Sequence, residues 1–280
     1  MGLLNLADEL LFLVVGYLSL KDLSHLLLTC RRLESTLTPH FHKRGLQDVG
    51  ELTALQWAAE KGHASLAKLA LSDGADIEKT DPRSAGGTAL HLAVKNKHIN
   101  VIRLLIDHGA RVSANDSGRM TPLHYAVLRK QEDAAKVLLE AGAEMVIVSA
   151  SMDTPAMLAA TLGSVNTMKA FLEAGFNINT RGPQGRTVLH AAAMECETGV
   201  LEYLLLEAGG EAIINVQDSV GLSPLALAIE KHYRDGMYAI NLLLQHGADP
   251  EMKDRLGVEL RKALRELEPA CLSLPWCFSG

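Results

Sequence analysis

The chain has 280 residues, of which 48% are hydrophobic and 21% charged, and its formal net charge is −6. This length suits one or two packed domains, and the acidic balance argues against a nucleic-acid-binding surface. Aromatic residues make up only 4% of the chain, so we expect a core of aliphatic side chains on closely packed helices. No apolar run reaches the roughly 18 residues of a membrane span, and four scattered cysteines indicate reduced thiols in the cytoplasm or nucleus.

Residues 1–47 predict three short helices with an unusual amount of apolar surface. The first begins near Ala7 and is apolar on almost every side, whereas a surface helix normally has one apolar stripe. Ser19 and Asp22 predict the capped start of the second helix, and Pro39 ends the third. A unit of about 40 residues rarely folds alone. We therefore expect these helices either to cap the segment that follows or to present leucines to another protein.

The segment from residue 48 to about 260 is built on a recurring quartet. Its clearest copy is Thr121-Pro122-Leu123-His124, and a threonine or serine begins each of six copies, at positions 53, 88, 121, 154, 187 and 223. A period of 33 to 36 residues is typical of stacked-repeat proteins. Each hydroxyl is expected to cap the helix that it precedes. The fourth copy departs most, because Met157 replaces the histidine.

A second, more apolar helix follows each quartet and is predicted to end at a glycine. Glycine just beyond a helix provides the left-handed conformation that closes the last turn. The spacing from hydroxyl to glycine is 21 residues in the first four repeats, and extra residues are expected in loops near Asp81, Glu211 and 231–235. The closing glycines are Gly74, Gly109, Gly142, Gly175, Gly209 and Gly247.

These two markers, present in every unit, resemble the ankyrin-repeat family. The resemblance implies an all-α solenoid over residues 48–260, with helix–turn–helix units joined by β-turn loops. It comprises six units and a truncated seventh that caps the stack, followed by a tail over residues 261–280. In this family the quartet histidine hydrogen-bonds backbone between units, which is the role expected of His91, His124 and His190.

Residues 1–47 also contain a characteristic leucine pattern, made up of Leu6-Ala7-Asp8-Glu9-Leu10-Leu11, Leu18, Asp22-Leu23, Leu26, Thr29-Cys30-Arg31 and Leu33. This pattern resembles the F-box, although Ala7 replaces the proline that the family usually has. The resemblance implies docking onto the Skp-type adaptor of a cullin–RING ubiquitin ligase. The implied contact residues are Leu6, Ala7, Leu10, Leu11, Val14, Leu18, Leu20, Leu23 and Leu27.

The sequence contains no recognisable catalytic, cofactor or metal motif, so we do not expect an enzyme. Target recognition is expected at the loop tips between repeats and along the inner helices, the surface that repeat proteins use for binding. Trp57 and Tyr125 share one inner-helix position, and each is interpreted either as a core-edge residue or as a recognition anchor. The candidate target-binding residues are Lys79, Asp81, Arg83, Asn115, Ser117, Arg119, Tyr125, Arg129, Arg181, Gln184, Gln217 and Ser219.

The sequence thus favours a non-enzymatic substrate receptor of a Skp–cullin–F-box ubiquitin ligase, which binds an adaptor through residues 1–47 and a target protein through the repeats. The alternative is an ankyrin scaffold in which the N-terminal helices only cap the repeat stack. The alanine at position 7 favours this alternative.

Overall fold

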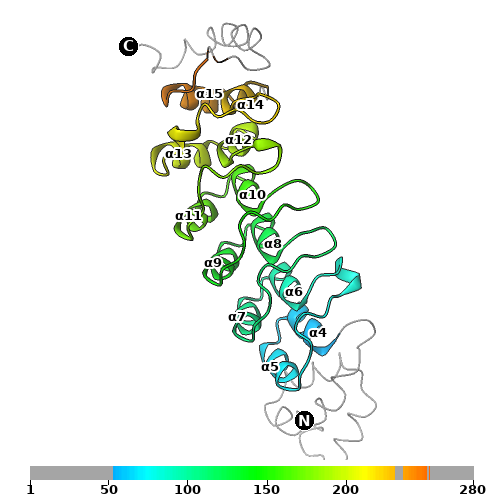
Figure 1. The fold of residues 1–280 in the computed structure, drawn as a ribbon. Coiled ribbons are helices and arrows are strands. Elements are labelled where there is room, and N and C mark those ends of the chain that lie inside the picture. Colours follow the sequence, from blue (N-terminus) through cyan, green and yellow to red (C-terminus); the bar gives the residue numbers. More distant parts are fainter. Residues whose placement is uncertain (1–52, 231–235, 251, 253–280) are drawn as a thin grey trace, which may run out of the picture. The chain divides into compact units, whose positions relative to one another are not determined.

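The computed structural model describes residues 53–230, 236–250 and 252 (Figure 1). The chain divides into two compact units, residues 1–117 and 118–280. The described part of each unit is helical. Among the described residues the only β-type pairing is an isolated bridge between Asp81 and Gly87, in the first unit. The predicted all-α repeat fold is therefore confirmed for these residues. The predicted F-box, the truncated seventh repeat and the C-terminal tail lie outside them.

The first unit contains two helix pairs. Inner helix α4 packs against inner helix α6, and outer helix α5 packs against outer helix α7. A short 3₁₀ turn, η2, lies in the loop between the pairs. The bounds are α4 Ala54–Lys61, α5 Ala64–Ser72, η2 Pro82–Ser84, α6 Ala89–Lys95 and α7 Ile99–Asp107.

The second unit repeats this arrangement four times. The inner helices α8, α10, α12 and α14 pack in sequence, and the outer helices α9, α11, α13 and α15 pack in a parallel row (Figure 1). The bounds are α8 Pro122–Leu128, α9 Glu132–Glu140, α10 Pro155–Thr161, α11 Val165–Glu173, η3 Pro183–Gly185, α12 Val188–Met194, α13 Thr198–Leu206, η4 Gly210–Ile213, α14 Pro224–Glu230 and α15 Gly236–Gln245.

Small side chains on the inner helices allow this close stacking. Ala93, Ala126, Ala159 and Ala192 are completely buried, each in the same part of its inner helix. Larger aliphatic residues fill the space toward the outer helices, and burial of each one stabilises the fold by roughly 1.5–3 kcal/mol. The largest fully buried side chains are Phe171, Leu55, Leu90, Ile102, Leu105, Leu123, Leu138, Met168, Leu189 and Leu201.

The predicted helix boundaries follow from the quartets and the glycines. The Thr121 hydroxyl accepts a hydrogen bond from the His124 backbone N–H at 3.3 Å, and Thr154 does the same for Met157 at 3.2 Å. All six closing glycines have a left-handed φ, between 75° and 91°. The amide after Gly109 then donates to the carbonyl of Leu105, which satisfies an end group of α7.

Extra residues are accommodated in the loops, as predicted. The longer loop near Asp81 forms η2, and the one near Glu211 forms η4. Neither insertion interrupts a helix, because a loop absorbs added length at little cost in free energy, whereas packed helices do not. The third predicted insertion, at 231–235, lies outside the described residues.

Candidate protein-binding surface

The quartet histidines form a structural network and not a reactive site. His124 and His190 are fully buried. In each case the N–H of the capping threonine donates to Nδ1, at 3.0 Å for His124 and 3.1 Å for His190. Because Nδ1 accepts, the hydrogen of the neutral ring lies on Nε2. Nε2 then donates to the next repeat, at 3.3 Å to the Asp153 carbonyl and 3.2 Å to the Leu222 carbonyl.

This arrangement keeps His190 uncharged. Burial lowers the pKa of His190 to about 4, although the Leu222 carbonyl and Asp218 act in the opposite direction. In the first described repeat Gln56 occupies the same position, and its amide donates to the Lys79 carbonyl at 2.8 Å. Gln56 therefore takes the place of the histidine as a neutral hydrogen-bond donor from the inner helix to the following loop. The predicted backbone-bonding role is confirmed for His124 and His190.

Met157 breaks this pattern in the fourth repeat. A thioether has no N–H, so α10 lacks the side-chain donor that His124 in α8 and His190 in α12 use to bond the following loop. The Met157 side chain instead turns toward Gly182, where an added Cβ would lie 2.4 Å from the methionine sulfur. The link between the fourth and fifth repeats is therefore apolar at a position where the neighbouring links are polar.

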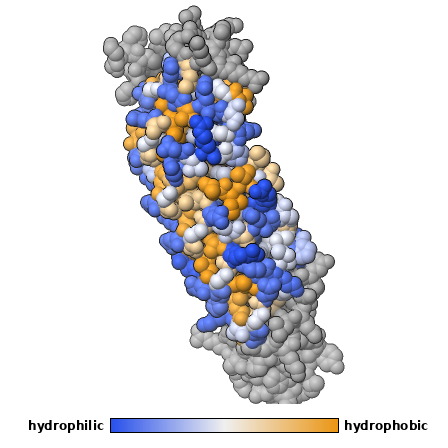
Figure 2. Space-filling view, in the orientation of Figure 1, coloured by the Kyte–Doolittle hydropathy of each residue, from blue (hydrophilic) through white to orange (hydrophobic). Residues whose placement is uncertain are grey.

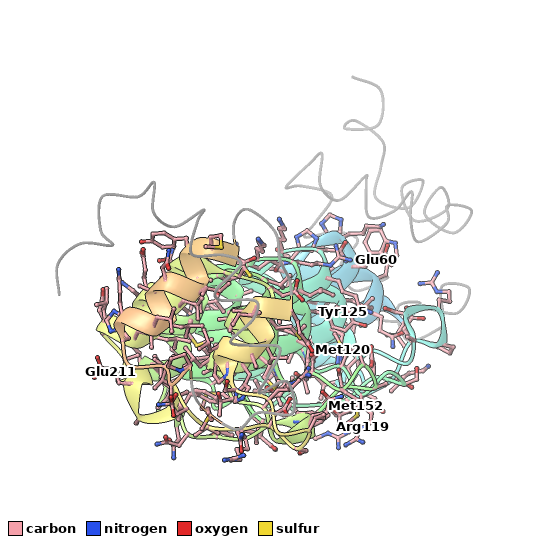
Figure 3. The ribbon with its side chains drawn as sticks, turned by 90° about the horizontal axis from the view of Figure 1, so that it is seen from above. Glu60, Arg119, Met120, Tyr125, Met152 and Glu211 are labelled. Atoms are coloured by element: carbon pink, nitrogen blue, oxygen red, sulfur yellow. The ribbon has the colours of Figure 1, made fainter. Side chains whose placement is uncertain are left out.

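The loop tips between repeats are joined by backbone hydrogen bonds. In the first unit the Ser117 N–H donates to the Ala85 carbonyl at 2.8 Å. In the second unit the Ala150 N–H donates to the Gly118 carbonyl at 2.9 Å, and Ser219 donates to Gln184 at 2.7 Å. Neighbouring tips in each unit therefore form an ordered surface. Figure 3 shows Arg119 and Met152 pointing outward from two tips of this kind.

Two tips hold a residue other than glycine at the left-handed position two residues before the capping hydroxyl. Glycines at the same loop position elsewhere, Gly86, Gly185 and Gly221, have φ of 72°, 68° and 82°. Arg119 and Met152 occupy that position with φ of 55° and 65°. A side chain in this conformation costs roughly 1–2 kcal/mol. At these two tips the strained backbone carries a long, exposed side chain, that of Arg119 or Met152.

Most of the predicted target-binding residues are exposed. In the first unit these are Lys79, Arg83, Asn115 and Ser117. In the second unit they are Arg119, Arg129, Arg181, Gln184 and Ser219, with Tyr125 and Gln217 half-buried. Trp57 is also half-buried, and its ring lies 5.1 Å from that of His63.

Asp81 is the exception among these residues. Its side chain is only 1% exposed, and its carboxylate accepts the Arg83 backbone N–H at 2.9 Å. It caps the 3₁₀ turn η2, so its carboxylate faces inward. Asp81 is therefore a loop-forming residue, and we remove it from the predicted binding surface.

A buried ion pair orders the tip between the fifth and sixth repeats. Arg186 Nε lies 3.1 Å from Asp218 Oδ2, and the Asp218 carboxylate also accepts the N–H groups of Val220 and Leu222. Burial by itself would raise the pKa of Asp218, but these two N–H donors and Arg186 outweigh it and hold that pKa below its ordinary value. The carboxylate is thus a fixed part of the loop.

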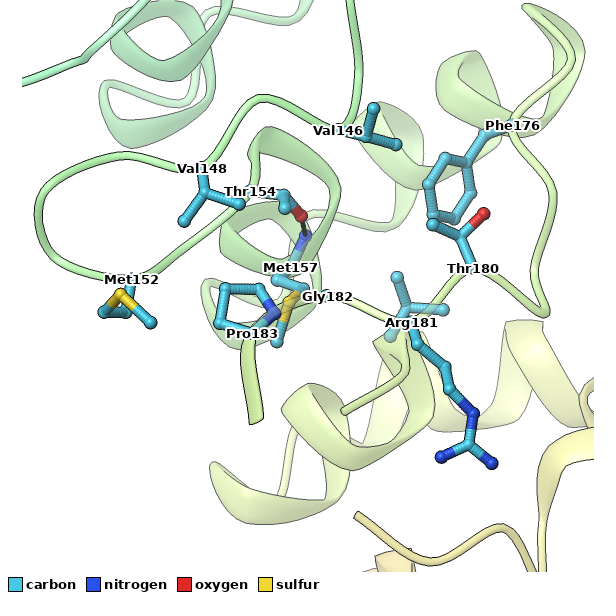
Figure 4. Close-up of a pocket in the computed structure, with 11 residues that line it drawn as sticks. Val146, Val148, Met152, Thr154, Met157, Phe176, Thr180, Arg181, Gly182 and Pro183 are labelled. Atoms are coloured by element: carbon cyan, nitrogen blue, oxygen red, sulfur yellow. Dashed lines mark hydrogen bonds between the residues drawn. The ribbon is translucent and has the colours of Figure 1, made fainter. Parts of the chain in front are cut away.

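A pocket of about 350 Å³ opens between the fourth and fifth repeats. Figure 4 shows apolar side chains from the two adjoining loops around Met157, with the Arg181 guanidinium extending away from them. Sequence reasoning did not find this pocket. Its indication in the sequence was the methionine at position 152, where three other loops have Gly86, Gly185 and Gly221. The lining residues are Val146, Val148, Met152, Thr154, Met157, Phe176, Thr180, Arg181, Gly182, Pro183 and Val188.

No group of three or more His, Cys, Asp or Glu side chains suited to a metal ion occurs within the described ranges. None of the helices described there is long and apolar enough to cross a membrane. Among the described residues, the loop side carries exposed polar tips and the apolar pocket. Such a surface has the composition of a binding face with an apolar centre and a polar edge.

The family model for ankyrin repeats (three copies) matches residues 21–116, 55–149 and 156–254. The chain belongs to the ankyrin-repeat family. The first match begins at residue 21, within the segment where an F-box was predicted, and no match to an F-box accompanies it.

Curated relatives share only parts of this array. The chain is 36% identical to inversin of Danio rerio over 83 residues, which is 30% of this chain and 8% of inversin. It is 37% identical to the potassium channel AKT1 of Arabidopsis thaliana over 75 residues, 27% of this chain and 8% of the channel. It is 41% identical to the B-cell lymphoma 3 protein homolog of Mus musculus over 63 residues, 22% of this chain and 14% of that protein.

The matched segments therefore span a small part of each relative, and the similarity concerns the repeats alone. Ankyrin-repeat proteins are generally non-enzymatic scaffolds for protein–protein interaction. The repeats imply that this chain binds some target protein.

Proposed function

We propose that the chain is the substrate-recognition subunit of a Skp–cullin–F-box ubiquitin ligase. Residues 1–47 dock the Skp-type adaptor, and the loop side of the repeats binds the target protein. The observation that supports target binding is the row of ordered, exposed tips with an apolar pocket at the fourth and fifth repeats. The receptor performs no chemistry itself but raises the local concentration of the target near the transferring enzyme.

The adaptor half of this proposal rests on the F-box resemblance of residues 1–47. The test is a pull-down of purified Skp-type adaptor by the full chain and by its Leu10→Asp, Leu11→Asp double variant. Two carboxylates in an apolar contact carry an uncompensated desolvation cost, so the variant should lose the adaptor. Ankyrin helicity, followed by circular dichroism, should stay unchanged. Adaptor binding that survives the double change would refute the docking proposal.

The second candidate is an ankyrin scaffold whose N-terminal helices cap the repeat stack. The family match that begins at residue 21 favours it, because it extends the repeat pattern into the predicted F-box. In this case Leu10→Asp with Leu11→Asp should destabilise the first repeats. The urea midpoint of the full chain separates the two candidates. A large fall in the midpoint without any adaptor binding by the parent chain favours capping, and an unchanged midpoint with loss of the adaptor favours docking.

A further inference from the structure

The pocket between the fourth and fifth repeats exists because this part of the array departs from the chain's own repeat pattern. Asp116 and Asp218 begin two of the tip loops and are both buried. Ser149 and Gly182 occupy the same position in the loops on either side of α10. Since Gly182 has no side chain, Met157 reaches into the space that a Cβ there would occupy. Two polar groups of the pattern, the aspartate and the histidine, are thus absent where the pocket opens.

The same departures place apolar side chains in contact with solvent. Val146 is 51% exposed and Met152 56% exposed. Both line the pocket, and both are among the few large apolar residues that are exposed in the described ranges. Figure 2 shows hydrophobic residues at the level of α8 and α10 with hydrophilic residues around them. Exposed apolar groups that gather at a cavity are a mark of an interaction site.

The edge of the pocket is positively charged. Arg181 lines it, and its guanidinium Nη1 donates to the Gln217 carbonyl at 2.9 Å and the Gly185 carbonyl at 3.4 Å. No carboxylate in the part of the chain that the structure describes forms an ion pair with Arg181, and the same holds for Arg119, which lies two tips away. The two carbonyl contacts hold the guanidinium in place while its other N–H groups remain available for a carboxylate.

One carboxylate, Asp153, lies within the same loop. Burial raises the pKa of its side chain. Its backbone carbonyl is already bound by His124. The carboxylates of Glu144 and Glu173 lie outside the lining of the pocket. The lining itself therefore contains one charged group, and that group is a cation.

We propose that this pocket binds an extended segment of a partner protein in which a large apolar side chain stands next to an acidic residue. The apolar side chain enters between Met152, Met157 and Phe176, and the acidic side chain meets Arg181. This inference rests on the proposed function of the repeats as a target-binding surface and specifies the chemistry of the target. It is independent of residues 1–47.

A protein segment fits this pocket better than a small molecule does. Its volume is at the lower end of the roughly 300–1,000 Å³ typical of ligand sites. Such sites usually have several polar groups that converge on the ligand, whereas here the only polar side chains of the lining are Thr154, Thr180 and Arg181, and the Thr154 hydroxyl accepts the Met157 N–H. An apolar pocket with a single cation at its edge suits the binding of one anchoring side chain within a larger protein–protein interface.

The test uses a phage-displayed library of linear heptapeptides, selected on the full chain and counter-selected on its Met152→Gly variant. Selected sequences should place Leu, Ile, Met or Phe beside Asp or Glu. Synthetic copies are then measured by fluorescence polarisation. Met152→Gly should weaken binding on the order of fivefold or more, as expected for loss of an anchoring contact. Glycine suits the left-handed conformation at this position, so a loss of binding does not reflect misfolding.

Two further variants make the result specific. Arg181→Gln should weaken binding of the acidic peptide but not of a peptide in which Gln replaces the acidic residue. Lys130→Gly relieves a left-handed residue with φ of 51° away from the pocket and should leave binding unchanged. The proposal fails if no peptide is recovered, if Met152→Gly binds as tightly as the parent chain, or if Arg181→Gln weakens both peptides equally. A Met152-dependent dimer in sedimentation velocity would also overturn it.

The failure of this inference can be distinguished from the failure of the proposed function. The Leu10→Asp, Leu11→Asp variant should bind the selected peptides as the parent chain does, whatever its effect on the adaptor. Peptide binding without adaptor binding would retain the pocket and reject the ligase assignment. Adaptor binding without any selected peptide would retain the ligase assignment and reject the proposed ligand of the pocket.

Discussion

His190 predicts a specific pH dependence of stability. Its pKa is 6.5 in the unfolded chain and about 4 in the folded one. Between these values the unfolded state binds the extra proton, so stability falls as the pH is lowered from about 6.5 toward 4. Above that window the histidine is neutral in both states and contributes no pH dependence.

The size of the effect follows from the two pKa values. The full shift corresponds to about 3 kcal/mol, and lowering the pH from 7 to 5 should remove about 2 kcal/mol of it. This is a substantial fraction of the 5–15 kcal/mol that typically stabilises a folded domain. The loss should concern the repeats joined by His190, since each repeat is stabilised mainly by its neighbours.

The chain itself suggests the control, because Gln56 performs the same bonding in the first described repeat. His190→Gln retains a neutral donor but does not titrate. Urea unfolding of both proteins at pH 7 and pH 5 should show that the stability advantage of the parent chain shrinks by about 2 kcal/mol at the lower pH. Nuclear magnetic resonance of the His190 ring should give a pKa near 4. A His190 that titrates near 6.5, or equal pH dependence in both proteins, would refute the bonding scheme.

Four other substitutions test the packing of the repeats by urea unfolding. Met152→Gly and Lys130→Gly should each raise the free energy of unfolding by about 0.5–1 kcal/mol, because relief of a left-handed side chain outweighs the added flexibility of the unfolded chain. If neither variant is more stable, the left-handed backbone at these positions is not strained. Gly210→Ala should lower stability by about 1–3 kcal/mol, since its Cβ would lie 2.6 Å from the Leu204 carbonyl oxygen, and a neutral result would show that the loop shifts freely. Arg186→Met should cost about 1–3 kcal/mol at neutral pH by leaving Asp218 buried with fewer partners. Because Arg186 helps to hold the pKa of Asp218 below its ordinary value, this cost should shrink as the pH falls through that lowered pKa and Asp218 takes up a proton. A cost that persists unchanged in strong acid would contradict the ion pair.

The repeat fold could be predicted from the sequence because its determinants are local. A hydroxyl, a proline and a glycine act on the nearest turn of helix, so Thr121, Pro122 and Gly142 determine helix ends without reference to distant residues. The period then brings equivalent residues together. The bond from His190 to the Leu222 carbonyl followed from its place in the repeat.

The binding surface was less predictable because its details depend on side-chain direction. Asp81 and Arg83 are two residues apart in one loop, yet the first is buried and the second exposed. The pocket depends on a contact between Met157 and Gly182, which are distant in the sequence. The departure of Met157 from the pattern was evident from the sequence. The pocket beside Met157 also depends on the next loop, where Gly182 has no side chain to fill the space.

Affinity purification with mass spectrometry tests whether one chain joins a ligase adaptor to a target protein. The full chain is compared with its Leu10→Asp, Leu11→Asp variant and with Met152→Gly. The parent chain should retain a Skp-type adaptor and a cullin. The double variant should lose both but retain the target, and Met152→Gly should lose the target but retain the adaptor. Absence of adaptor and cullin from the parent purification, or joint loss of adaptor and target in either variant, would contradict the proposed function.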